Sequence, residues 1–172
     1  MQALSQTIDA INRVVGRVVS WSILVIVLLQ FAVVIMRYVF GFGSVWVQET
    51  ITYVYATSFM ATAGYALLRD GQVRVDIFYR DAAPRPKAVV DILGTLIFLW
   101  PVTGLLLWVA SPYVARSFAI FEGSRETAGL PIVYLLKAEI LLFAGLLALQ
   151  GLSLTIRSVF VLVGRPLPKP IV

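Results

Sequence analysis

A chain of 172 residues that is 60% hydrophobic and only 13% charged cannot form the charged shell that a soluble domain of this size requires. It contains neither cysteine nor histidine, which excludes disulfides, thiolate or imidazole metal sites and a Ser-His-Asp triad. The net charge of +5 comes from basic residues at the ends of apolar runs, without a patch that would bind nucleic acid, so we expect a membrane protein that is not an enzyme and holds no metal or cofactor.

The first segment, residues 1–16, carries Leu4, Ile8, Ile11 and Val15 at spacings of four, three and four, with polar residues between them. This period is typical of an amphipathic helix. We expect the helix to lie on the membrane surface before the chain enters the bilayer. A frayed cytosolic tail is the alternative.

Four apolar segments follow, each long enough to cross a bilayer as a helix. The predicted spans are residues 15–40, 46–68, 87–119 and 131–162. The first contains one strongly polar residue, Gln30, for which a hydrogen bond to another helix is favoured over a transport contact. The sequence therefore predicts an all-α integral membrane protein, with residues 1–172 forming a single membrane domain.

The second span is rich in small residues, reading ATSFMATAG from position 56 to position 64. Small side chains let helix backbones approach closely in lipid, where packing drives association. We therefore expect this helix to be buried between others and to offer a packing face to a partner subunit. The candidate packing residues are Ala56, Ser58, Ala61, Thr62 and Ala63.

Prolines punctuate the second half of the chain. Pro84 and Pro86 predict the start of a helix, because proline suits the first helical turn. Pro101 and Pro112 lie inside the third span and predict local kinks, since proline removes a backbone donor.

The basic residues set the orientation. Ten of the fourteen lie on the side of the two termini and the 69–86 loop, and four lie on the other side. The ten are Arg13, Arg17, Arg69, Arg74, Arg80, Arg85, Lys87, Arg157, Arg165 and Lys169; the four are Arg37, Arg116, Arg125 and Lys137. The positive-inside rule predicts that both termini, the 69–86 loop and the 163–172 tail are cytoplasmic, and that the 116–130 loop is external.

Glu49 is the sharpest candidate for a functional side chain, because a carboxylate in a membrane helix marks a functional site by default. It lies near the outer end of its span, and Arg37 lies across the turn. A structural Arg37–Glu49 pair, or a carboxylate stabilising the start of its own helix, is favoured over proton coupling. The competing hypothesis is a self-sufficient homo-oligomeric carrier or channel that uses Glu49. A membrane anchor for a soluble enzyme is a third possibility.

Two stretches carry a resemblance to a known family. The string RYVFGFGSVWVQET, followed by a small-residue span that ends GYALLRDGQVRVD, resembles the DctQ-type small membrane subunit of the tripartite ATP-independent periplasmic (TRAP) transporters. The resemblance extends over roughly residues 15–160 and includes the LPIVYL segment before the last helix. One departure is Gln72, where the family often has histidine. The signature residues are Arg37, Tyr38, Trp46, Glu49, Gly64, Tyr65, Arg74 and Asp76.

The resemblance implies an accessory subunit in the bacterial inner membrane. Such subunits pair with a large elevator-type membrane subunit that holds the substrate and sodium sites, and a periplasmic binding protein delivers the substrate. By this analogy the chain is a scaffold without a cofactor, and the 116–130 loop is periplasmic. Tryptophan and arginine at both membrane borders suit bound phospholipid. The candidate docking residues for the binding protein are Phe42, Ser44, Glu122, Arg125 and Glu126.

Overall fold

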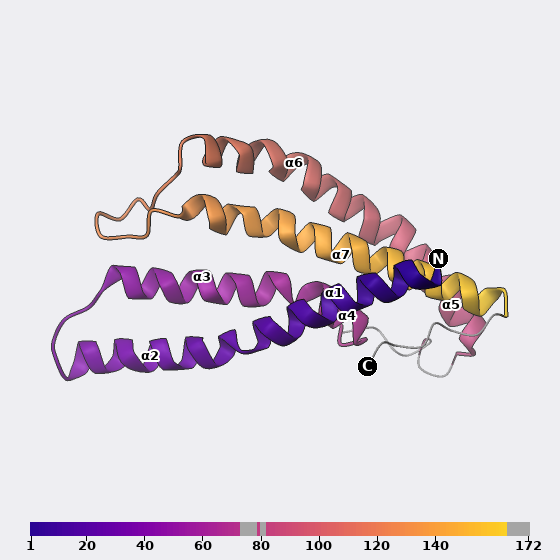
Figure 1. Cartoon of the computed structure of the whole chain (residues 1–172), viewed down its shortest axis with the longest axis horizontal. Coiled ribbons are helices and arrows are strands. Elements are labelled where there is room, and N and C mark those ends of the chain that lie inside the picture. Colours follow the sequence, from indigo (N-terminus) through magenta and orange to yellow (C-terminus); the bar gives the residue numbers. More distant parts are fainter. Residues whose placement is uncertain (73–78, 80–81, 165–172) are drawn as a thin grey trace.

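The computed structural model describes residues 1–72, 79 and 82–164, and every regular element within them is helical. The elements are α1 (Gln2–Ser20), α2 (Ser22–Tyr38), α3 (Val45–Ala61), α4 (Ala63–Leu68), α5 (Pro84–Gly94), the π-helix η1 (Thr95–Leu99), α6 (Trp100–Ala119) and α7 (Val133–Leu162) (Figure 1). The signature residues Arg74 and Asp76 lie outside the described residues.

Three helical segments of the described chain are long and apolar enough to cross a membrane: Gln2–Tyr38, Pro84–Ala119 and Val133–Leu162. The second predicted span is also helical, but it is interrupted at Thr62, which leaves a 17-residue α3 and a 6-residue α4. Helix α3 returns alongside α2 and runs antiparallel to it (Figure 1). The prediction of an all-α integral membrane protein is confirmed.

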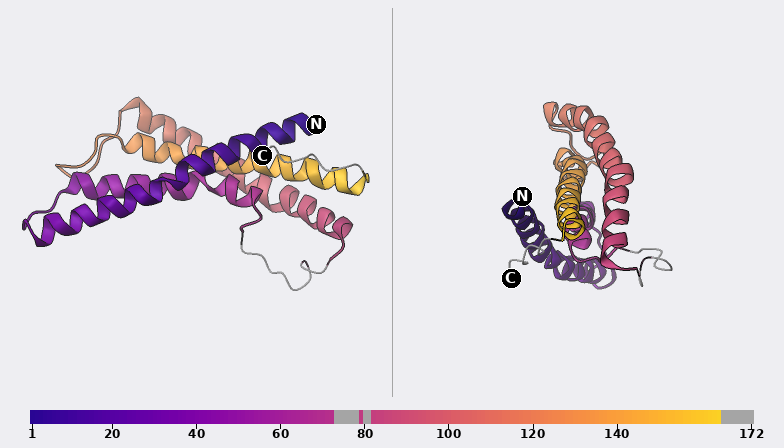
Figure 2. Two further views of the ribbon diagram at one scale, coloured as in Figure 1. Left: turned by 60° about the horizontal axis from the view of Figure 1, so that its bottom comes forward. Right: turned by 90° about the vertical axis from the view of Figure 1, so that its right-hand side faces the viewer.

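Helix α1 forms as its periodicity predicts, and it continues into α2 with one change of direction at Trp21 (Figure 2). Its polar residues Ser5, Asp9 and Asn12 are buried against the rest of the chain, whereas Leu4 and Ile11 are exposed. The packed face is therefore mainly the polar one, because its partners on α7 are polar as well. Whether α1 lies on the membrane surface stays a prediction.

The third span is one continuous helical rod from Pro84 to Ala119 that contains a wide π-helical turn. That turn, η1, ends just before Pro101, whose ring nitrogen cannot donate to the preceding turn. A π-bulge is one of the ways in which a helix absorbs such an interruption. Pro112 lies inside the regular part of α6. The disturbance predicted at Pro101 is therefore found as a local widening of the helix.

The helices that surround the 39–44 and 120–132 connections form a single layer and not a closed bundle. Their order is α6, α7, α3, α2, and each contacts only its neighbours in this row (Figure 1). Helix α2 stands at one edge and has no buried residue. Helix α7 also supports α1, α4 and α5 towards the opposite end, where the N-terminus lies (Figure 1). The core of the protein therefore forms where the other helices pack against α7.

Glycines allow the closest helix contacts. A Cβ atom at Gly16 of α1 would lie 2.7 Å from the Cβ atom of Tyr65, and one at Gly64 of α4 would lie 3.1 Å from the carbonyl oxygen of Leu146. Ordinary carbon contacts need more room than this. The small-residue segment thus serves close packing as predicted, but the helices it approaches belong to the same chain.

Candidate functional sites at the two ends of the helix layer

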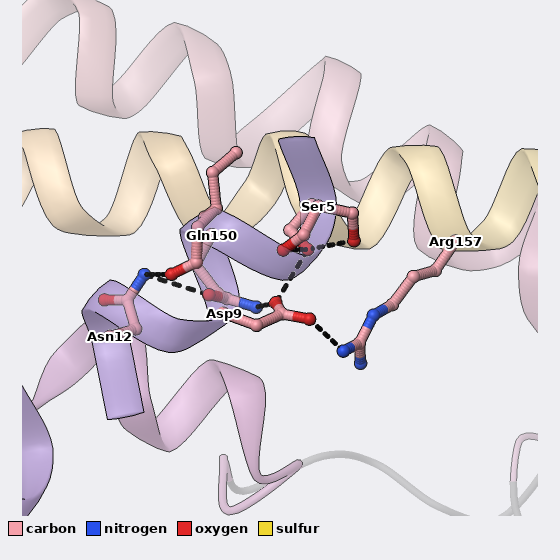
Figure 3. A network of polar contacts seen from close by, with 7 residues as sticks. Ser5, Asp9, Asn12, Gln150 and Arg157 are labelled. Carbon is pink, nitrogen blue, oxygen red and sulfur yellow. Dashed lines mark hydrogen bonds and ion pairs between the residues drawn. The ribbon is translucent and has the colours of Figure 1, made fainter. Parts of the chain in front are cut away.

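A buried polar network joins α1 to α7 at the end of the molecule that holds the N-terminus (Figure 3). Each helix contributes three polar side chains from one face, because spacings of three and four residues return to the same side of a helix. The members are Ser5, Asp9 and Asn12 on α1, and Gln150, Ser153 and Arg157 on α7.

Asp9 is the centre of this network. One of its carboxylate oxygens accepts hydrogen bonds from Ser153 Oγ at 2.7 Å and from Gln150 Nε2 at 3.1 Å, and the other forms an ion pair with Arg157 Nη2. Asp9 is itself buried. A buried carboxylate is tolerated only when donors and a counter-charge replace its hydration, and Asp9 has both.

Two further bonds extend the network along α1. Ser153 gives its proton to Asp9, so the Ser5 hydroxyl donates across the 2.7 Å contact between the two serines. Asn12 Nδ2 donates to Gln150 Oε1 at 2.9 Å. The network binds α1 to α7, and its charges cancel within it.

The sequence patterns alone do not predict this network. Its signal is a polar stripe at i, i+4 and i+7 in residues 5–12 that matches a stripe at i, i+3 and i+7 in residues 150–157. Either stripe alone predicts a solvated face.

Glu49 fastens the opposite end of the layer. Its Oε1 atom accepts a hydrogen bond from Ser124 Oγ, and its Oε2 atom accepts one from the Leu130 backbone N–H at 2.6 Å. Both partners belong to the connection between α6 and α7. A Cβ atom at Gly129 would lie 2.8 Å from Glu49 Oε1, so a glycine at this position keeps the carboxylate accessible to the loop.

The predicted Arg37–Glu49 pair is wrong. Arg37 lies exposed at the end of α2, and no ion pair joins it to Glu49 in the described part of the chain. Glu49 begins the second turn of α3 and faces the 120–132 connection, because backbone and hydroxyl donors there meet both carboxylate oxygens. Glu49 therefore joins α3 to the α6–α7 hairpin and not to α2.

A second carboxylate of the same connection is also held from within. Glu122 forms an ion pair with Lys137 and accepts a hydrogen bond from Ser117 Oγ at 2.7 Å. Donation by Lys137 and then by Ser117 holds the pKa of Glu122 below its ordinary value of 4.5. The Lys137 ammonium lies 4.3 Å from the ring centroid of Tyr113, which adds a cation–π contact.

The five candidate docking residues divide into two groups. Phe42 is 54% exposed, and Arg125 and Glu126 are exposed as well. Ser44 and Glu122 are half-buried, and Glu122 is engaged by the ion pair described above. The structure thus brings Phe42, Arg125 and Glu126 to the surface of the two connections at the same end of the layer (Figure 1).

The candidate packing residues are used partly inside the chain. Ala61 is only 1% exposed, and the Ser58 hydroxyl forms a hydrogen bond with that of Ser22 on α2. Ala61 therefore has no surface left for a partner in this conformation. The other three, Ala56, Thr62 and Ala63, are half-buried.

The remaining signature residues serve different parts of the fold. Tyr38 and Trp46 are exposed on either side of the 39–44 connection. Gly64 and Tyr65 lie in the close contact between α1 and α4. Within the described residues, no cluster of acidic side chains could hold a metal ion.

The fold and these contacts define a multi-pass α-helical membrane protein in which Asp9, Glu49 and Glu122 join segments of the chain. Residues 26–161 match the family model described as "Tripartite ATP-independent periplasmic transporters, DctQ component". The chain belongs to this family, and it is thus an inner-membrane component of a TRAP transporter. Comparison with curated proteins and with solved structures gives no match.

Proposed function

We propose that this chain is the accessory scaffold subunit of a sodium-coupled TRAP solute uptake transporter. It packs against a large elevator-type membrane subunit and helps to dock a periplasmic substrate-binding protein. The single-layer arrangement of α6, α7, α3 and α2 carries the proposal, because a layer presents two broad faces to other helices. Faces that the partner does not cover meet lipid.

The charged side chains support a structural role. Asp9 pairs with Arg157, Glu122 with Lys137, and Glu49 is bonded to the backbone of a connection. Charges that carry ions or protons are expected to line a cavity inside the membrane. These three carboxylates instead fix the relative positions of segments of the chain.

The external connections support the docking role. The 39–44 and 120–132 connections lie at one end of the layer, and Glu49 ties the second connection to α3. Phe42, Arg125 and Glu126 are exposed on them. An exposed aromatic side chain and two exposed charges at the same end of the layer suit an interface with a soluble protein.

Reconstitution tests the proposal against the self-sufficient carrier. We expect sodium-dependent uptake in proteoliposomes only when the chain, the large membrane subunit and the binding protein are all present. Uptake or proton flux with the chain alone would support the carrier that uses Glu49. A large hydrophobic partner is expected to co-purify from native membranes, whereas a membrane anchor would bring down a soluble enzyme.

Charge reversal tests the docking surface. The double variant Arg125→Glu, Glu126→Arg is expected to weaken binding-protein affinity about tenfold while assembly with the large subunit stays intact. The matched control is Arg85→Glu, an exposed charge on α5 at the opposite end of the molecule (Figure 1). Equal affinities for the wild type and the double variant would count against docking at this connection.

A further inference from the structure

Helix α2 has a defined inner side and two exposed flanks. The half-buried residues Ser22, Ile26, Leu29, Val33 and Met36 recur at spacings of four and three, and the Ser22–Ser58 contact shows that this side faces α3. At 100° per residue, Gln30 lies about 80° around the helix from the middle of this stripe.

The two flanks of α2 differ in chemistry. Gln30 is exposed, and its side-chain amide has no hydrogen-bond partner among the described residues. The opposite flank carries Val25, Leu28 and Ala32, which are also exposed and are all apolar. The apolar flank matches acyl chains throughout, whereas the other flank holds the Gln30 amide among apolar side chains.

Helix α3 has an exposed stripe of its own, at Gln48, Thr52, Tyr55 and Phe59. Tyr55 is 62% exposed and Phe59 is 67% exposed. The Tyr55 hydroxyl has no hydrogen-bond partner within the described parts of the chain. This stripe lies about a quarter turn from the Ser58 side, which faces α2.

The two stripes share one face of the α2–α3 hairpin. The two helices are antiparallel. On each helix, the stripe is rotated away from the side that contacts the other helix, in the direction in which the helix turns as the residue number increases. For antiparallel right-handed helices, equal rotations of that kind lead to the same face of the pair. Gln30 and Tyr55 therefore project from one surface, which we name the Gln30–Tyr55 face (Val27, Gln30, Val34, Tyr55 and Phe59).

Both unpartnered groups lie at membrane depth. Gln30 is about 12 Å along α2 from Ser22, and Tyr55 is about 15 Å along α3 from Val45, at 1.5 Å per residue. A bilayer core about 30 Å thick offers no hydrogen-bond partner at these positions. A neighbouring protein helix does offer one, and polar side chains commonly bond across helices in membranes.

We propose that the Gln30–Tyr55 face is the binding surface for the large membrane subunit, which places a spanning helix with hydrogen-bonding side chains over the Gln30 amide and the Tyr55 hydroxyl. This inference rests on the proposed function and names the face that the proposed function leaves open. The apolar flank of α2, at Val25, Leu28 and Ala32, faces lipid.

Single-cysteine labelling tests the assignment, and the chain suits it because its natural sequence contains no cysteine. Nitroxide labels are attached through Val34→Cys and Phe59→Cys on the proposed face. The matched controls are Leu28→Cys and Ala32→Cys on the other flank. Oxygen accessibility is measured by electron paramagnetic resonance in nanodiscs, first for the chain alone and then for the complex with the large subunit.

We expect the labels on the proposed face to lose at least about threefold in oxygen accessibility on assembly, while the controls change little. Equal changes on both flanks, or shielding at the control positions alone, would overturn the assignment. Shielding at Val34 in the chain alone would identify a second copy as the occupant, and retained accessibility in the complex would identify lipid. Either result refutes the proposal.

A second measurement avoids the bulk of the label. Gln30→Leu is expected to weaken association with the large subunit about threefold, the usual worth of one interhelical hydrogen bond, whereas Ala32→Leu leaves it unchanged. Equal affinities for the two variants would contradict the role of Gln30. Co-purification of the unaltered chain with the large subunit is measured first. If it fails, the proposed function is refuted and this inference falls with it; if it succeeds, the variants test the face alone.

Discussion

Removal of the Arg157 side chain should destabilise the protein severely, because it leaves a buried carboxylate without a counter-charge. The Asp9 side chain is 3% exposed, whereas that of Arg157 is 27% exposed. In Arg157→Ala, Asp9 keeps its neutral donors Gln150 and Ser153 but loses the guanidinium. Breaking a buried ion pair in this way costs about 3–5 kcal/mol, and partial exposure of Arg157 favours the lower end.

The reverse substitution should cost less. Asp9→Asn leaves the charge on Arg157, whose partly exposed guanidinium can turn towards water, so we expect a loss of about 1 kcal/mol. The double variant Asp9→Asn, Arg157→Ala removes both charges and is expected to be no less stable than Arg157→Ala alone. The coupling energy from the cycle should be about 2 kcal/mol.

Thermal unfolding in detergent, followed by the fluorescence of the four tryptophans, measures these differences. A loss of 3 kcal/mol corresponds to a fall in Tm of about 6–12 °C for a chain of this size. Arg17→Ala is the control, because Arg17 lies exposed in the last turn of α1. If the Tm of Arg157→Ala lies within about 2 °C of this control, or if the two single effects simply add, the network does not hold α1 in place.

Three further predictions address other contacts. Gly64→Ala should destabilise the protein by about 1–3 kcal/mol, because its Cβ would overlap the Asn12 side chain of α1. Gly145→Ala should stabilise the protein slightly, because nothing lies within 4 Å of a Cβ at that position. Equal Tm values for the two variants would contradict the contact at Gly64. Because its folded-state pKa is lowered, Glu122 should contribute stability above pH 4.5 that is lost as the pH falls through that lower pKa. Glu122→Gln should abolish this acid-dependent part of the Tm profile between pH 3 and 6. An unchanged profile in the variant would refute the contribution of Glu122. Glu49→Gln removes one of two acceptors and should speed amide hydrogen exchange in the 120–132 connection about tenfold without altering ion coupling; a normally assembled complex that lost only coupling would reverse this conclusion.

The helical spans could be predicted because their signals are local. Hydropathy and length reveal an apolar helix regardless of its neighbours, and Pro84 marks a helix start through its own geometry. The widened turn before Pro101 follows from the missing donor of one residue. Each of these features depends on a few consecutive residues.

The buried face of α1 and the partners of Glu49 could not be predicted, because they depend on contacts between distant segments. The hydrogen bonds of Asp9 join residues more than 140 positions apart, and Glu49 and Leu130 are 81 positions apart. A helical period shows which residues share a face, but not which neighbour covers that face. In lipid the rule for soluble helices also loses its force, since exposed leucine or isoleucine carries no penalty there.

The single layer has a mechanical consequence. Neighbouring helices meet along one line each, so the layer resists loads along the helix axes but can hinge or shear between them. Two of the contacts that oppose this shear lie at opposite ends: Glu49 fixes α3 to the α6–α7 hairpin at the end with the 39–44 and 120–132 connections, and Asp9 fixes α1 to α7 at the other end. Since α1 continues into α2, the α2–α3 hairpin is joined to the α6–α7 hairpin at both ends of the layer. A partner that moves against this layer therefore meets a surface whose helices cannot slide past one another.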